Sequence, residues 1–311
     1  MPHWKLKALI QGSISRLPDA QRWNRLLQKY ITRSLELDDE YLISKWQQAL
    51  RHTQNYRRHT GNSRGFSALE LGTGWFPINP IGLALSGASP VYTIDRQVLF
   101  QREQLVQVLD RFQALADKGL VELVAEGASE RLRQTLDASQ DQTLKAQDLL
   151  QMLGIRSIVG DARAMCLETA SIDLVCSNNT LEHIPADTIA AIFREFHRLL
   201  KRRGLMSHHI DLSDHYSHFD SSISVYNFLQ FPEVHWQRYN NDLLYQNRLR
   251  LSDYMALHRE TAWRVIDEDS LRKPIEALRA VHIADEFRHY DESDLAVYNC
   301  WILSKPEVSE S

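Results

Sequence analysis

The stretch that decides the fold is ELGTGWFP, residues 70–77. It begins in the apolar run of residues 66–71, which is typical of a buried strand, and it precedes a helical pattern that ends at Gly87. Gly72 and Gly74 permit backbone angles that a Cβ would forbid and let the backbone approach a ligand closely. Strand, glycine loop and helix in this order are typical of a nucleotide-binding α/β sheet.

Strand-like and helical patterns alternate through the rest of the chain. Apolar stripes over 105–112 and 252–261 predict helices, as does the stripe over 189–200, which Gly204 is expected to end. Further strands are predicted at 91–95, 156–159, 172–176, 205–210, 264–267 and 297–303. The alternation predicts a Rossmann-like, doubly wound, mainly parallel seven-stranded α/β sheet with helices on both faces.

The domain organisation follows from where this alternation starts and where it is interrupted. Residues 1–62 are expected to form a helical N-terminal cap, because Trp23, Leu26, Leu27, Tyr30 and Ile31 recur at helical spacing. The α/β domain is expected at 63–305, followed by a tail at 306–311. Two insertions, at about 125–153 and 212–251, are predicted to form a substrate lid. The apolar face of residues 1–17 is expected to dock on the protein body, although it could also lie on a membrane.

Composition excludes some functions. The 36 Lys and Arg residues are outnumbered by 40 Asp and Glu, for a formal net charge of -4, so nucleic acid is not an expected partner. Three separated cysteines argue against a disulfide framework, and no signal peptide or transmembrane segment is recognised. A cytoplasmic location is therefore expected.

The loop departs from the dinucleotide-binding pattern in an informative way. Pro77 replaces the third glycine of G-x-G-x-x-G and removes a backbone N–H that a pyrophosphate would use. Glu70 and Asp95, each at the end of a predicted strand, suit a ligand that carries positive charge and a ribose. A nicotinamide-dependent oxidoreductase is accordingly the less favoured enzyme class.

Four features follow one another along the chain: ELGTG at 70–74, Asp95, GDA at 160–162 and IDLVCSNNTLEHI at 172–184. Through them the sequence resembles, across most of 66–303, the class I S-adenosylmethionine-dependent methyltransferases, although Phe76 stands where the family commonly has a third glycine. It implies S-adenosyl-L-methionine as cofactor. The residues expected to hold the cofactor are Glu70, Gly72, Thr73, Gly74, Asp95, Arg96, Asp161, Ala162, Asn178 and Asn179.

A dense polar cluster, HHIDLSDHYSHFD at 208–220, follows the fifth predicted strand. Methyl transfer by in-line displacement needs a base only where the acceptor must lose a proton. His209 and Asp211 lie on one face of the strand and could pair as base and orienting carboxylate, and His215 is the next candidate. No metal is expected, because the reaction does not require one, but the same cluster could also suit zinc or iron.

An aromatic and amide-rich stretch follows at 226–248. Such side chains could stack on and hydrogen-bond a glycan or another small molecule, but the aromatics could equally pack in the core or in a homodimer interface. A weaker resemblance to bacterial methyltransferases of polysaccharide and specialised-metabolite pathways suggests the same class of acceptor. A non-catalytic binding or regulatory protein of this fold is the second alternative. The residues expected to contact the acceptor are His183, Tyr226, Trp236, Asn241 and Arg248.

Overall fold

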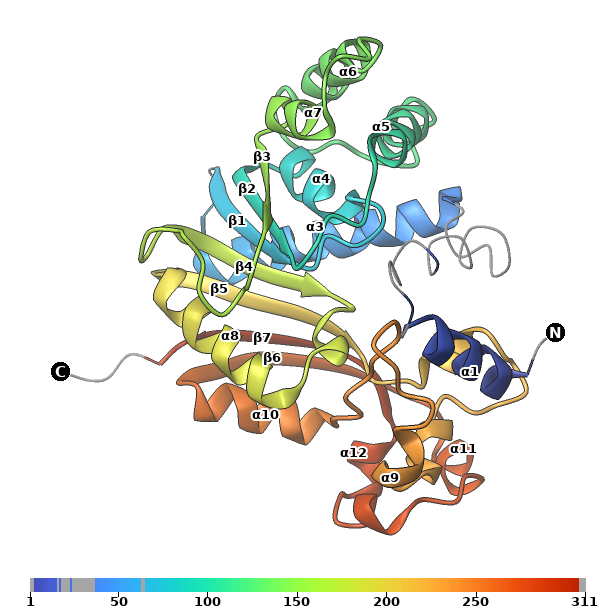
Figure 1. Cartoon of the computed structure of the whole chain (residues 1–311). Helices are drawn as coiled ribbons and strands as arrows, with labels where there is room; N and C mark the ends of the chain where they lie inside the picture. Colours follow the sequence, from blue (N-terminus) through green and yellow to red (C-terminus); the bar gives the residue numbers. More distant parts are fainter. Residues whose placement is uncertain (1–2, 16, 18–22, 24–36, 63–64, 308–311) are drawn as a thin grey trace.

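Seven strands form one mixed sheet in the order β3-β2-β1-β4-β5-β7-β6. The structure is a computed structural model that describes residues 3–15, 17, 23, 37–62 and 65–307. Only β7 runs antiparallel to its neighbours (Figure 1). The predicted Rossmann-like, doubly wound sheet is thereby confirmed. Its strands are β1 (Phe66–Leu71), β2 (Ala88–Asp95), β3 (Ile155–Val159), β4 (Ile172–Asn178), β5 (Leu200–Asp211), β6 (Trp263–Arg272) and β7 (Val297–Pro306).

The predicted role of Gly204 is wrong. Helix α8 (Ala186–Leu199) passes directly into β5 at Leu200, so Gly204 lies inside the strand. A Cβ on Gly204 would lie 2.5 Å from Cγ of Leu200 and 2.9 Å from the carbonyl oxygen of Asp173. The glycine is therefore required by close packing within the sheet and not by a helix end.

Helices cover both faces of the sheet, as the alternation predicts. Helices α3 (Asp39–Thr60), α4 (Ile78–Leu85) and α5 (Arg102–Asp117) share a buried core with one face, whereas α8 and α10 (Leu251–Glu260) share a second core with the other. Helix α3 belongs to the predicted N-terminal cap, yet it packs against α4 and β5 as one of the covering helices. Residues 24–36, which carry most of the helical pattern predicted for the cap, lie outside the described residues.

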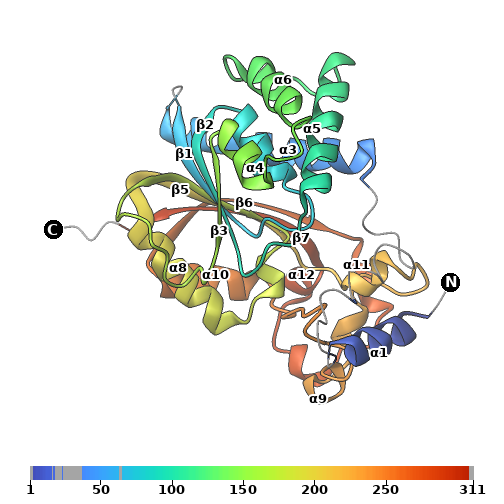
Figure 2. The same cartoon turned by 45° about the horizontal axis from the view of Figure 1, so that its top comes forward.

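The two insertions lie far apart in both views (Figures 1 and 2). Residues 125–153 form α6 (Ala128–Ala138) and α7 (Ala146–Met152), which pack on α5 and β3 respectively. Residues 212–251 lie beside α1 (Trp4–Ile14), at the opposite end of the molecule. The two segments therefore do not join into one lid.

A third hydrophobic cluster, which we call the accessory core, joins three segments that are distant in sequence. Its first segment is α1, which the sequence predicts to dock on the body. The others are 212–251, with η2 (His215–His218), η3 (Asn227–Gln230) and α9 (Glu233–Trp236), and 273–296, with α11 (Ile275–Arg279), η4 (Asp285–Phe287) and α12 (Glu292–Leu295). The accessory core consists of Trp4, Ala8, Tyr216, Tyr226, Phe228, Leu229, Trp236, Leu278, Ala284, Phe287, Leu295 and Ala296.

The strand order reverses between β1 and β4, because the chain leaves β1 toward β2 and β3 and then returns to β4 on the other side of β1. Ligands of doubly wound sheets bind beyond the carboxyl ends of the strands at such a switch point. No helix in the described part of the chain is long and apolar enough to cross a membrane.

Candidate cofactor and acceptor site

The glycine loop leaves β1 at this switch point and enters α4. Gly72 and Gly74 have φ angles of 89° and 69°, in the left-handed region that favours glycine. The hydroxyl of Thr180, from the loop after β4, donates to the carbonyl of Leu71 over 3.2 Å. A Cβ on Gly72 would lie only 2.4 Å from Oγ1 of Thr180, so the two loops approach each other too closely for any other residue.

Glu70 lies underneath this loop. Its side chain is fully buried, and Oε2 accepts a hydrogen bond of 2.8 Å from Thr93, whose hydroxyl oxygen lies 2.6 Å from that of Thr73. Burial raises the pKa of Glu70 to about 8, with the Asp95 carboxylate adding to the effect and the Thr93 bond opposing it. Glu70 therefore supports the loop from the buried core through Thr93 and Thr73.

Asp95 closes the other side of the loop. Its Oδ2 accepts from the backbone N–H of Gly74 over 3.3 Å, and the residue is half-buried at the end of β2. Burial raises the pKa of Asp95, and backbone N–H groups, that of Gly74 foremost, oppose the shift. A carboxylate held here can accept hydrogen bonds from the two hydroxyls of a ribose. Arg96 follows it on the exposed surface.

The remaining predicted cofactor residues lie at the ends of β3 and β4. Asp161 is exposed and pairs with Arg163 at 2.6 Å, which lowers its pKa to about 2, while Ala162 is buried in the second core. Asn178 is buried, and Asn179, with a φ of 50°, donates its N–H to the carbonyl of His209. The predicted cofactor residues thus follow the carboxyl edge of four adjacent strands.

The expected pairing of His209 with Asp211 is not present. The carboxylate of Asp211 accepts from the hydroxyl of Ser213 at 2.6 Å and lies 3.5 Å from Nε2 of both His215 and His218. Side chains two residues apart on a strand are separated by about 7 Å, whereas the turn after β5 brings His215 and His218 back toward Asp211.

His209 is positioned by β7 instead. Its Nε2–H donates to Oδ1 of Asn299 over 2.8 Å, and its ring stacks on Trp301 with a centroid separation of 4.7 Å. Burial lowers the pKa of His209 to about 4, so the ring is neutral at pH 7. Its Nδ1 is left with a lone pair and no hydrogen-bond partner.

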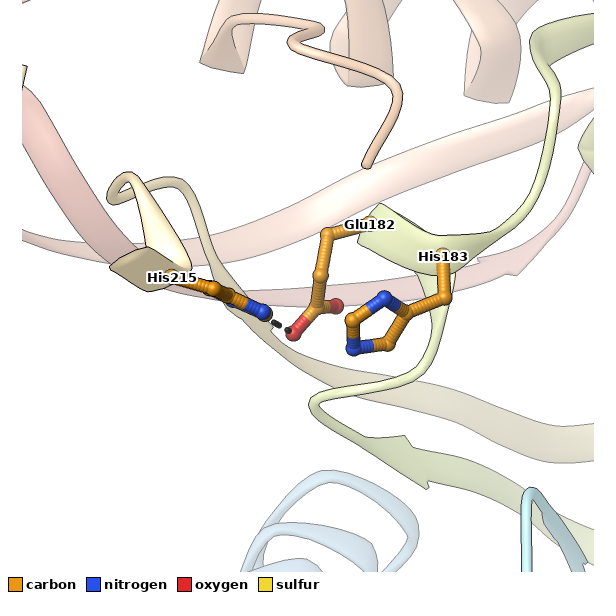
Figure 3. A group of neighbouring side chains, drawn as sticks. All are labelled: Glu182, His183 and His215. Carbon is orange, nitrogen blue, oxygen red and sulfur yellow. Dashed lines mark ion pairs between the residues drawn. The ribbon is translucent and has the colours of Figure 1, made fainter. Parts of the chain in front are cut away.

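Beyond β4, Glu182 and His183 of η1 (Leu181–His183) face His215 of η2 (Figure 3). Nδ1–H of His183 donates to the carbonyl of Tyr245 over 2.7 Å. Nε2 of His215 lies 4.0 Å from Oε1 of Glu182, and burial lowers the pKa of His215 well below its usual value. Glu182 was missed in the sequence, although it lies directly before His183 in the LEHI motif.

Helix α3 contributes two further residues that the sequence did not single out. His52 donates from Nε2 to Oδ1 of Asn178 at 3.1 Å, and its Nδ1 lies 2.8 Å from the hydroxyl of Ser207. Burial lowers the pKa of the Lys45 ammonium, and the charges of Glu182, Glu70 and Asp211 oppose this shift. His52 and Asn178 are 126 positions apart in sequence, so no local pattern reveals this contact.

The predicted acceptor contacts within 226–248 do not form a binding surface. Tyr226 and Trp236 are 0% and 1% exposed in the accessory core, and the Tyr226 hydroxyl donates to the carbonyl of Ala296. Arg248 is also buried and pairs with Glu233 and Glu286. The rings of Tyr226 and Trp236 therefore pack in the core, which is one of the alternatives that the sequence left open. The amide of Asn241 bonds to the backbone of Tyr239 and Leu243.

Comparison with known proteins agrees with this geometry. A family described as "Methyltransferase domain" matches residues 123–207, which include β3, β4 and most of β5 but not the glycine loop. Together with the strand order, the match places in this chain a class I methyltransferase domain. Residues 123–207 thus belong to an S-adenosylmethionine-dependent methyltransferase domain, with S-adenosylmethionine as its methyl donor. No curated protein matches the sequence.

Solved structures resemble the chain at low sequence identity. A methyltransferase from Bacillus halodurans is 13% identical, with a TM-score of 0.44 over 82% of this chain and 99% of that one. Geranyl diphosphate C-methyltransferase from Streptomyces coelicolor is 10% identical, with a TM-score of 0.44 over 82% of this chain and 77% of that one. The [4+2]-cyclase SpnF is 13% identical, with a TM-score of 0.43 over 84% and 82%.

Proposed function

We propose that the enzyme methylates a hydroxyl group of a small molecule or glycan by in-line displacement, with a histidine accepting the proton of the acceptor. The observation that carries this proposal is the fixed imidazole of His209 at the end of β5, beside the switch point. Burial lowers the pKa of His209 and keeps its ring neutral. A neutral imidazole can take a proton from a hydroxyl as the methyl group is transferred.

His209 is the proton acceptor in this proposal. Asn299 fixes its Nε2–H, so Nδ1 carries the free lone pair, and the stacked ring of Trp301 holds the imidazole in one orientation. The low pKa of His209 makes it a weak base at equilibrium, but it keeps the ring unprotonated across the physiological range. The sulfonium of the cofactor is already an activated leaving group, so a weak, well-placed base is sufficient.

The acceptor class follows from charge. The chain has a net charge of -4, which disfavours a phosphate backbone as acceptor. A cytoplasmic location belongs to the same proposal and is supported by the free thiols of Cys166, Cys176 and Cys300.

Substitution of His209 tests the proposal. With methyl-labelled cofactor and a metabolite extract as the source of acceptors, His209→Asn should lose label incorporation by at least about 100-fold while S-adenosylhomocysteine still binds. His258→Asn is the matched control, because His258 is also a buried histidine with a lowered pKa but packs against Phe193 on the other face of the sheet. Full activity of His209→Asn would contradict the assignment of the base.

A further inference from the structure

Glu182, His183 and His215 converge on one point from two separate turns (Figure 3). One donor atom from each residue lies within 4.8 Å of the other two. Two imidazole nitrogens and one carboxylate oxygen are ligands that zinc and divalent iron or manganese accept. Methyl transfer from a sulfonium does not itself require this grouping.

The donor atoms that face this point are free of hydrogen bonds. Both carboxylate oxygens of Glu182 and Nε2 of His215 are buried and have no hydrogen-bond partner. His183 donates its Nδ1–H to the carbonyl of Tyr245, and that carbonyl can only accept, so Nε2 of His183 carries the lone pair. A backbone carbonyl that fixes the tautomer in this way is the usual outer partner of a metal-binding histidine.

The burial of these groups also suits a bound cation. Glu182 is 1% exposed and Asp211 is 7% exposed. Lys45 is the nearby ammonium, but its own hydrogen bond goes to Gln48. A buried carboxylate without a paired charge is costly, and a bound cation removes that cost.

We propose that Glu182, His183 and His215 bind one divalent transition-metal ion, with Asp211 as a fourth ligand. Asp211 is suited to this role because its Oδ2 lies 3.5 Å from Nε2 of His215. Three or four protein ligands leave a coordination position for water or for an oxygen of the acceptor. The sequence analysis predicted no metal. In the proposed site His215 is a metal ligand, and His209 remains the proton acceptor.

The test measures metal binding and not activity. Untagged full-length protein is stripped with a chelator, dialysed, and titrated with Zn²⁺, Mn²⁺ and Co²⁺ by calorimetry, and its metal content is measured by mass spectrometry. We expect one ion per chain, a rise in melting temperature with the metal, and a visible absorption band with Co²⁺. Glu182→Gln and His215→Gln should each weaken binding by at least about 10-fold and abolish the thermal shift.

Two controls separate the site from nonspecific binding and from misfolding. His258→Gln removes a buried histidine outside the cluster and should leave the metal affinity unchanged. Binding of S-adenosylhomocysteine reports whether each variant is folded, because none of the proposed metal ligands is among the predicted cofactor residues. Absence of a bound ion in the unsubstituted protein, or equal affinity in Glu182→Gln and the unsubstituted protein, would overturn the proposal and leave the methyltransferase assignment intact.

Discussion

Substitution of the two loop glycines by alanine separates backbone strain from steric conflict. Both residues have positive φ angles, so alanine at either position costs about 1 kcal/mol in backbone strain. A Cβ on Gly74 meets nothing within 4 Å, whereas a Cβ on Gly72 would lie 2.4 Å from Oγ1 of Thr180. Relief of that conflict must displace Thr180 and break its hydrogen bond to the carbonyl of Leu71, which adds about 1 kcal/mol.

The expected loss of unfolding free energy is therefore about 2 kcal/mol or more for Gly72→Ala and about 1 kcal/mol for Gly74→Ala. Urea denaturation measures both values. Because Thr180 supplies the difference, Thr180→Ala should cost less in the Gly72→Ala background than in the unsubstituted protein. Equal losses for the two glycine variants, or strictly additive effects of Gly72→Ala and Thr180→Ala, would refute this account of the loop.

Three further substitutions test other parts of the structure. Glu70→Gln should flatten the pH dependence of the unfolding free energy. With a folded pKa of about 8, Glu70 keeps a proton that the unfolded chain releases above about pH 4.5. The unfolding free energy of the unsubstituted protein therefore falls as the pH rises from about 4.5 to about 8, and the loss is about 3 kcal/mol at pH 7. If Glu70→Gln and the unsubstituted protein had the same urea denaturation midpoint as each other at pH 5.5, and again at pH 8, this prediction would be contradicted. Tyr226→Phe loses the hydrogen bond to the Ala296 carbonyl and should lower the unfolding free energy in urea by about 1 kcal/mol. The KM for any acceptor should not change. A raised KM would indicate that Tyr226 contacts the acceptor. Trp4→Ala should weaken the docking of α1 by about 3 kcal/mol. Limited proteolysis should then release α1, while S-adenosylhomocysteine still binds. If α1 were as protected from proteolysis as in the unsubstituted protein, Trp4 would not be what holds it.

The strands, and the positions of the glycine loop and of Asp95 at strand ends, could be predicted because their signals are local. These positions follow from neighbours in sequence and from the two-residue period of a strand. Element ends were less predictable, because they depend on packing. Gly204 has the sequence context of a helix end, but the approach of Leu200 and Asp173 requires it inside β5.

The acceptor side could be predicted only in part. The HHIDLSDHYSH cluster begins on β5 and continues past its carboxyl end, and the partners of its histidines are Asn299 and Trp301 from β7 and Glu182 from η1, all distant in sequence. The aromatics of 226–239 have the composition of a sugar-binding surface. They are buried because α1 and residues 273–296 cover them, and no periodicity of the stretch itself reveals that cover.

Calorimetric titration with S-adenosylhomocysteine tests the cofactor site most directly. The account predicts binding of one molecule per chain, no binding of NADH, and an affinity that falls about 10- to 100-fold in Asp95→Asn through loss of charge-assisted hydrogen bonds to the ribose. Absence of binding at millimolar S-adenosylhomocysteine, or unchanged affinity in Asp95→Asn, would contradict it.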